Sequence, residues 1–212
     1  SCNSNKSDMK KSLSIFFFLF FFIFKSEAFA RMQIVLFGDS LMAGYGLSKP
    51  YHLSEVLKLE LKNLKVESEV INASVSGDTT RGGLNRIQWT LQDKADLIVL
   101  GLGANDMLRG IEPKEIKENL NQIIKSIKNK NIPIVLAGFV APESYAKNYK
   151  ESFDDIYKAL SKEHNLTLMP FLLEGVVLNP KLNIEDGKHP NAEGVKIIAK
   201  NLAPYILKEI KK

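Results

Sequence analysis

The chain alternates between short apolar runs and longer stretches in which apolar and polar positions follow a helical period. The apolar runs are bounded by turn residues, and several are apolar at almost every position, which is typical of parallel strands covered on both faces. We therefore predict five strands, over residues 33–37, 67–73, 96–102, 133–138 and 167–169.

The intervening stretches predict helices over residues 53–63, 80–93, 113–130 and 145–164, and a last helix from about 191 to 210. The stretch 113–130 has its isoleucine and leucine residues on one stripe, and Pro113 suits its first turn. Strands that alternate with helices predict an α/β fold, a three-layer α/β/α sandwich around a five-stranded parallel sheet.

The first thirty residues have the pattern of a secretory signal peptide. Lys10 and Lys11 precede an apolar run over residues 13–24, and small residues at 28 and 30 resemble a cleavage site. This run is shorter than the roughly 20 residues that a membrane-spanning helix needs. We predict export to the periplasm, cleavage after Ala30 and no stable membrane anchor; a retained N-terminal anchor is the alternative. Met9 resembles a natural start, which would make residues 1–8 an upstream extension.

Residues 31–212 are expected to form one domain. They carry 25 basic and 22 acidic residues, a net charge of +3 that does not indicate nucleic-acid binding. The only cysteine is Cys2, so this part has no disulfide and no thiol nucleophile. It lacks a metal-ligand cluster, a phosphate loop and a dinucleotide-binding motif, so we expect no metal and no cofactor. We also expect a monomer.

Ser40, Asp186 and His189 supply the parts of a nucleophilic hydrolase. A serine hydroxyl is inert at neutral pH unless a base takes its proton, and that base needs a carboxylate to hold its tautomer. His189 has a nearby acid in a loop-like Asp-Gly…Pro-Asn setting, whereas His52 and His164 lie in helical or helix-end sequence and are interpreted as packing or surface residues.

The predicted sheet brings these residues together, because ligands bind outside the carboxyl ends of parallel strands. Ser40 follows the first strand, Gly77 the second and Asn105 the third, while Asp186 and His189 follow the fifth. Hydrolysis of an acyl bond passes through an oxyanion that needs hydrogen-bond donors. The backbone N–H groups of Ser40 and Gly77 and the Asn105 amide are candidates.

Each of these segments also has a purely structural interpretation. Gly77-Asp78 is a common turn, and Asp78 or Thr79 suits the cap of the next helix. Asn105-Asp106 is equally compatible with the opening of a loop. The functional interpretation rests on the occurrence of all four segments in this order.

In this order, the four segments resemble the four sequence blocks of the SGNH (GDSL) hydrolases. The matching residues are Gly38-Asp39-Ser40-Leu41, Ser76-Gly77-Asp78-Thr79, Gly103-Ala104-Asn105-Asp106 and Asp186-Gly187-Lys188-His189-Pro190. The resemblance covers nearly all of residues 31–212. It implies a flavodoxin-like fold with strand order 2-1-3-4-5. It makes Ser40 the nucleophile, His189 the base and Asp186 its carboxylate partner, with Ser40, Gly77 and Asn105 as oxyanion donors. Ala104 departs from the glycine that is frequent there.

The function expected from the residues and the resemblance is a secreted serine hydrolase of acyl esters and thioesters, of arylesterase, lysophospholipase or thioesterase type, acting through an acyl-enzyme. A carbohydrate O-acetylesterase and a non-catalytic binding module are the alternatives. Asp39, Leu108 and Tyr145 are predicted substrate contacts. Apolar residues in 139–142 and 171–178 suit an acyl chain, but they are equally compatible with the core.

Overall fold

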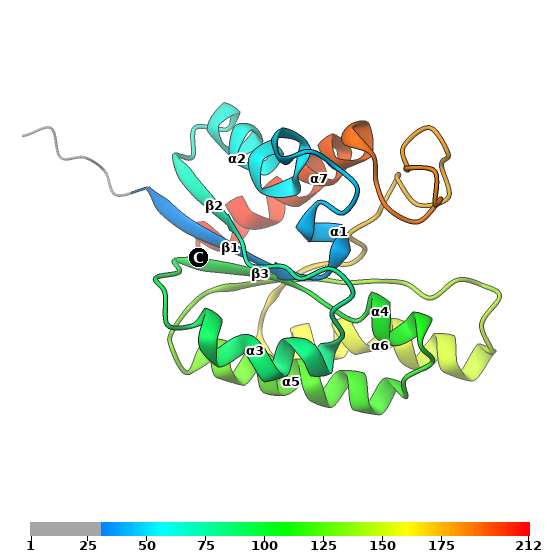
Figure 1. Ribbon diagram of the computed structural model, residues 1–212. Coiled ribbons are helices and arrows are strands. Elements are labelled where there is room, and N and C mark those ends of the chain that lie inside the picture. Colours follow the sequence, from blue (N-terminus) through cyan, green and yellow to red (C-terminus); the bar gives the residue numbers. More distant parts are fainter. Residues whose placement is uncertain (1–30) are drawn as a thin grey trace, which may run out of the picture. The chain divides into compact units, whose positions relative to one another are not determined.

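The computed structural model describes residues 31–212 (Figure 1). The predicted signal peptide, its cleavage after Ala30 and Cys2 lie outside the described residues. No helix within 31–212 has both the length and the hydropathy required to cross a membrane.

The sheet has five parallel strands in the order β2-β1-β3-β4-β5, which confirms the order that the resemblance implied. The central strands β1 and β3 are buried on both faces, which explains why their sequences are apolar at successive positions. The predicted strands agree with the observed ones to within a few residues. Their bounds are β1 (Met32–Gly38), β2 (Ser68–Asn72), β3 (Leu97–Gly101), β4 (Ile134–Ala137) and β5 (Thr167–Met169).

Two layers of helices enclose the sheet. In Figure 1, α2 and α7 lie above the strands and pack against each other, while α3, α5 and α6 lie below. The five long helices were predicted to within a few residues. The described helices are α1 (Ser40–Ala43), the 3₁₀ helix η1 (Lys49–Tyr51), α2 (Leu53–Asn63), α3 (Thr80–Thr90), α4 (Ala104–Leu108), α5 (Pro113–Lys128), α6 (Lys147–His164) and α7 (Ala192–Ile210).

The register of the central strands aligns their carboxyl ends. On one side of β1, Leu36 pairs with Asn72 of β2, and on the other side Gly38 pairs with Gly101 of β3. The loops that follow these strands therefore begin at the same edge of the sheet. Figure 1 shows α1, α4 and the loop that leads into α7 at this end of the molecule.

A buried polar contact fastens two of these loops to each other. Asp106 in α4 is 1 % exposed. Its carboxylate accepts hydrogen bonds from the backbone N–H of Thr80 at 2.8 Å and from the Thr80 hydroxyl at 2.6 Å. Asn119 of α5 donates to the same hydroxyl at 3.1 Å. The start of α3 is thereby held against α4, the helix that carries Asn105.

Candidate active site

Ser40 is the first residue of α1 and directly follows β1. Asp39 caps this short helix, because its carboxylate accepts from the backbone N–H of Leu41 at 3.0 Å. The turn is tight: a side chain at position 38 would collide with Met42 and with the Gly101 carbonyl. The strand therefore ends in a glycine, and the nucleophile candidate projects from the sheet edge.

His189 lies between the other two members of the predicted triad. Its Nδ1 is 2.5 Å from Asp186 Oδ2, and its Nε2 is 2.8 Å from Ser40 Oγ. Because an ionised carboxylate can only accept, Nδ1 carries the hydrogen in this contact and Nε2 is left to accept from the serine. The structure thus joins residues 149 positions apart in one line of hydrogen bonds.

The loop that carries Asp186 and His189 is folded tightly. Asn183 and Pro190 form an antiparallel bridge, and Gly187 occupies the left-handed region with φ +69°. Asn191 then caps α7 by accepting from two backbone N–H groups. The Asp-Gly…Pro-Asn sequence therefore forms a short hairpin that presents both side chains and then starts the last helix.

Asp186 is strongly biased towards its ionised form. Partial burial opposes ionisation, but the backbone N–H groups of His189 and Lys188 donate to the carboxylate, and the His189 ring adds a third hydrogen bond. Together these donors lower the pKa of Asp186 to about 2. The group beside the imidazole is therefore a carboxylate throughout the neutral range.

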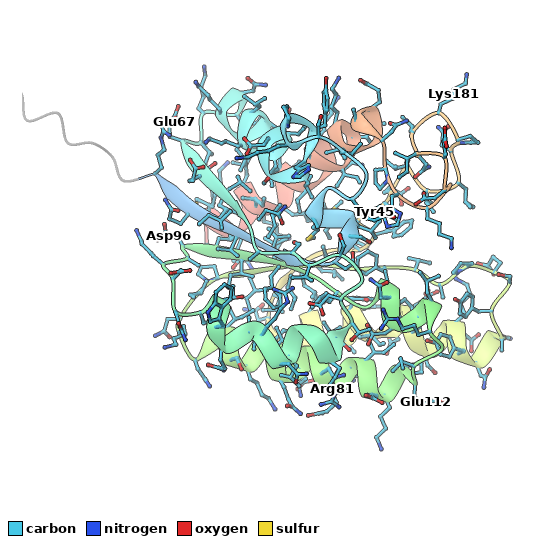
Figure 2. The ribbon with its side chains drawn as sticks, viewed as in Figure 1. Tyr45, Glu67, Arg81, Asp96, Glu112 and Lys181 are labelled. Atoms are coloured by element: carbon cyan, nitrogen blue, oxygen red, sulfur yellow. The ribbon has the colours of Figure 1, made fainter. Side chains whose placement is uncertain are left out.

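An aromatic ring covers one side of the imidazole. The ring centroids of Tyr45 and His189 are 4.5 Å apart, and Figure 2 labels Tyr45 at this end of the molecule. Tyr45 belongs to a turn between Gly44 and Gly46, both in the left-handed region. His52 braces this turn with a hydrogen bond to the Leu47 carbonyl at 3.0 Å, which agrees with the predicted packing role.

Three hydrogen-bond donors come from the loops around Ser40. Within the described residues, the backbone N–H groups of Ser40 and Gly77 donate to no other protein group. The Nδ2 of Asn105 donates to Asp39 Oδ2 at 3.1 Å and retains a second N–H. Gly77 has φ +81° and open space where a Cβ would lie. Its carbonyl accepts from Arg109 at 2.9 Å, which connects the Gly77 loop to the end of α4.

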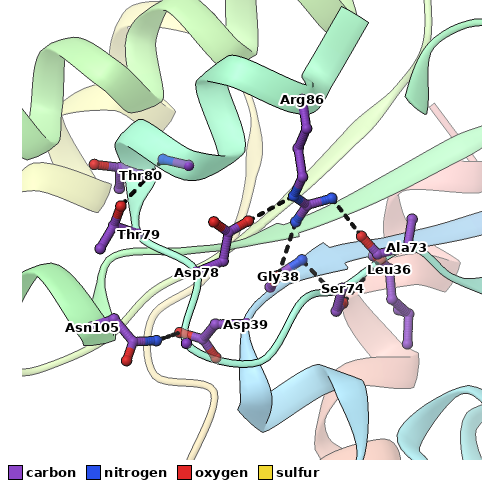
Figure 3. Close-up of polar contacts among 12 residues, drawn as sticks. Leu36, Gly38, Asp39, Ala73, Ser74, Asp78, Thr79, Thr80, Arg86 and Asn105 are labelled. Carbon is purple, nitrogen blue, oxygen red and sulfur yellow. Dashed lines mark hydrogen bonds and ion pairs between the residues drawn. The ribbon is translucent and has the colours of Figure 1, made fainter. Parts of the chain in front are cut away.

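Arg86 of α3 fixes the same loop from the other side. Its guanidinium donates to Asp78 at 2.6 Å, to the Ala73 carbonyl at 2.6 Å and to the Gly38 carbonyl at 3.1 Å (Figure 3). It also lies 3.9 Å from the centroid of the Phe37 ring. Sequence reasoning missed this residue, because an arginine within a helical pattern carries no sign that it is half-buried and bound to three groups of neighbouring segments.

Of the two residues predicted as possible caps of α3, the structure uses Thr79. Asp78 is the ion-pair partner of Arg86, and the Thr79 hydroxyl caps α3 by accepting from the backbone N–H of Gly82 at 3.2 Å. Asn105-Asp106 opens the short helix α4 and not merely a loop.

The three predicted substrate contacts occupy different environments. Leu108 is 59 % exposed at the end of α4. Tyr145 is half-buried; its hydroxyl donates to the Met107 carbonyl at 3.2 Å, which ties the loop before α6 to α4. Asp39 is fully buried, and both of its oxygens accept hydrogen bonds from protein groups. This position disagrees with the expected contact between Asp39 and a substrate.

The buried carboxyl of Asp39 ionises less readily than an exposed one. Burial raises its pKa to about 6, although the Leu41 N–H, the Asn105 amide and the charge of His189 all act in the opposite direction. The charge of nearby Asp78 adds to the increase. Two aspartates of this site therefore have pKa values displaced in opposite directions.

The described residues contain no group of three or more histidine, cysteine, aspartate or glutamate side chains arranged to hold a metal ion. The functional groups that the site does present are a hydroxyl hydrogen-bonded to an imidazole, a carboxylate on the other side of that imidazole, and hydrogen-bond donors. This set suits attack on a carbonyl and stabilisation of the resulting oxyanion.

Comparison with known proteins decides the family. The model of the GDSL-like Lipase/Acylhydrolase family matches residues 36–197. The chain belongs to this family, the GDSL/SGNH esterases. It is 37% identical over 191 residues to an arylesterase of Vibrio mimicus, an alignment that covers 90% of this chain and 96% of that protein.

Two further similar proteins match this chain over most of their own length. The thioesterase 1/protease 1/lysophospholipase L1 of Escherichia coli strain K12 is 35% identical over 194 residues, covering 89% of this chain and 92% of that protein. The crystal structure of the psychrotrophic esterase EstA from Pseudoalteromonas sp., inhibited by monoethylphosphonate, has a TM-score of 0.80 at 29% identity, covering 85% of this chain and 99% of that one.

The raised pKa of Asp39 predicts a dependence of stability on pH. The folded protein keeps this proton up to about pH 6, whereas the unfolded chain releases it near the ordinary value of 3.8. The folded state binds more protons between these values, so the contribution of Asp39 to stability falls as pH rises from about 4 to about 6, by about 3 kcal/mol in all. Asp39→Asn should lack this loss and gain relative stability above pH 6. Urea unfolding of both proteins from pH 4 to pH 7.5 measures the difference; parallel curves would contradict the prediction.

Proposed function

We propose that this chain is a secreted serine hydrolase that cleaves acyl esters and thioesters through an acyl-enzyme intermediate. Ser40 is the nucleophile, His189 the general base and Asp186 the carboxylate that orients His189. The observation that carries this proposal is the hydrogen-bonded line from Asp186 through His189 to Ser40 Oγ. Secretion rests on the signal-like pattern of residues 1–30.

In the first half-reaction, Ser40 Oγ attacks the acyl carbon while His189 Nε2 accepts the hydroxyl proton. The carbonyl π electrons move onto oxygen and form a tetrahedral oxyanion. When this intermediate collapses, the bond to the alcohol or thiol breaks, and His189 returns the proton to the leaving group. The acyl group is then an ester of Ser40.

In the second half-reaction, water takes the place of the leaving group. His189 accepts a proton from water, whose oxygen attacks the acyl carbon, and a second oxyanion forms. Its collapse releases the carboxylic acid and returns the proton to Ser40. In each half-reaction a negative charge develops on the same carbonyl oxygen. Hydrogen-bond donors around that oxygen therefore stabilise both tetrahedral intermediates.

The oxyanion donors in this proposal are the backbone N–H groups of Ser40 and Gly77 and the side-chain amide of Asn105. Support comes from the two backbone N–H groups, which no acceptor within residues 31–212 uses, and from the second N–H of Asn105. Donors held by surrounding structure need no reorganisation when the charge develops. The contacts of Arg86 and Arg109 supply that restraint for the Gly77 loop.

Apolar groups at the strand ends support an acyl or aryl substrate over an acetylated carbohydrate. Tyr45, Val75, Leu108 and Val177 are exposed on segments that follow four different strands. The names of the relatives, an arylesterase and a thioesterase/lysophospholipase, agree with this class. We expect kcat/KM for nitrophenyl esters to rise from acetate to longer acyl chains, with little release of acetate from acetylated xylan. The reverse order would favour a carbohydrate O-acetylesterase.

Ser40→Ala should abolish ester hydrolysis and leave the fold intact, because it removes only the nucleophilic hydroxyl from a half-buried position at the start of α1. Loss of a nucleophile in such a triad reduces the rate by about 10⁴-fold or more. A fluorophosphonate probe should label the wild type at Ser40 and fail to label the variant; the phosphonate-inhibited Pseudoalteromonas esterase is a precedent within the family. A folded variant with wild-type turnover would refute the assignment.

Asp186→Asn should lower kcat by about 10⁴-fold, because an amide stabilises the wrong imidazole tautomer and does not stabilise the imidazolium. His189→Ala should cost more, about 10⁶-fold. Catalysis by the wild type needs a neutral imidazole, because only that form accepts the proton of Ser40. Turnover against pH for the three proteins tests this order, and full activity of Asp186→Asn would remove Asp186 from the mechanism.

A further inference from the structure

We propose that Asp39 is a positioning residue that sets the orientation of the Asn105 carboxamide and thereby presents its free N–H to the oxyanion. This inference rests on the proposed function, in which Asn105 is one of three oxyanion donors. It assigns a task to a buried carboxylate that takes no direct part in the triad chemistry.

Asp39 is an unusual group to find in this interior. Its side chain is fully buried, and none of the ion pairs among residues 31–212 includes it. One oxygen accepts from the Leu41 N–H and the other from Asn105 Nδ2. A buried carboxyl without a cationic partner is costly to the folded state. The helix cap alone does not require a charge, because serine or asparagine caps equally well.

The contact with Asn105 does depend on the charge. A carboxamide has an acceptor at one end and an NH₂ donor at the other, whereas an ionised carboxylate can only accept. Ionised Asp39 therefore selects the orientation in which the NH₂ of Asn105 faces it (Figure 3). One hydrogen of that NH₂ is used by Asp39, and the other remains for a ligand.

A neutral group at position 39 reverses this preference. Protonated Asp39, or an asparagine there, presents a donor that pairs with the carbonyl oxygen of Asn105. The amide then rotates by a half-turn, and its NH₂ leaves the position from which it serves the oxyanion. The side chain at position 105 is unchanged, yet its contribution to catalysis is lost.

Several titratable or charged groups surround Asp39. His189 comes from the loop before α7, Asp78 from the loop before α3 and Tyr157 from α6. Arg86 reaches the Gly38 carbonyl and forms an ion pair with Asp78. With the pKa of Asp39 raised to about 6 by its burial, Asp39 takes up its proton below that pH. The Asn105 donor is then withdrawn from the oxyanion position.

A double-mutant cycle tests the coupling between the two residues. The proteins are the wild type, Asp39→Asn, Asn105→Ala and the double variant, assayed with p-nitrophenyl butyrate at pH 8. Asn105→Ala should lower kcat by about 10²–10³-fold. Asp39→Asn should lower kcat by about 10²-fold with KM within threefold, and the double variant should be no slower than Asn105→Ala alone. Asp96→Asn is the matched control: this carboxylate also accepts a backbone N–H, from Gln33, at the opposite end of the sheet (Figure 2).

Asp39→Ser provides a readout that a packing role would not produce. Serine keeps the helix cap, and its hydroxyl does not force the amide into the reversed orientation. It should therefore retain more activity than Asp39→Asn, although it leaves a larger void. A packing role predicts the opposite order, and thermal unfolding shows that each variant is folded.

The outcomes separate the inference from the proposed function. If Asn105→Ala kept wild-type kcat, the oxyanion role of Asn105 would fail, while Ser40 labelling would still test the triad. If Asn105→Ala were impaired but Asp39→Asn lowered kcat equally in both backgrounds, the two residues would act independently and the inference would be overturned. Wild-type kcat for Asp39→Asn would overturn it directly.

Discussion

The parallel pairing of β1 with both β2 and β3 is the constraint on which the rest of the structure depends. A strand at the centre of a parallel sheet fixes where its neighbours end, and here Gly38 lies opposite Gly101 while Leu36 lies opposite Asn72. The three loops that carry Ser40, Gly77 and Asn105 therefore leave the sheet at one edge. Each loop needs only a few residues to reach the site, so their positions inherit the rigidity of the buried strands.

Strand pairing fixes where the loops begin but not their conformation. Polar side-chain contacts hold the loops in place. Arg86 joins the loop after β2 to the end of β1, and Asp106 joins the start of α3 to α4. Both use charged side chains at buried or half-buried positions, where hydrogen bonds to charged groups are strong and an unpaired partner is costly. The donors proposed for the oxyanion are therefore held by side chains that are neither triad members nor oxyanion donors.

The sequence predicts the features that a local residue pattern determines. It does not predict features that depend on contacts between distant segments. Strands and long helices repeat their hydrophobic period over enough residues to be identified, but α1, η1 and α4 span only three to five residues. Ser40, Asp186 and His189 stand out because triad chemistry needs those residue types and each follows a predicted strand at the same edge of the sheet. The substrate contact predicted for Asp39 disagrees with its burial, which depends on contact with α4, more than 60 residues away in the sequence. Arg86 was missed for the same reason.

The two aspartates show how one residue type serves two purposes within a single site. Asp186 lies near the surface, where donors from its own loop and from His189 lower its pKa to about 2. Asp39 lies in the interior, where burial outweighs its two hydrogen bonds and raises its pKa to about 6. In the proposed mechanism, Asp186 must stay charged to hold an imidazolium, and its environment ensures this at every pH at which the base is active. Asp39 needs its charge only to orient an amide. The two aspartates therefore differ in role because their environments differ: Asp186 supports the base His189, and Asp39 orients the oxyanion donor Asn105.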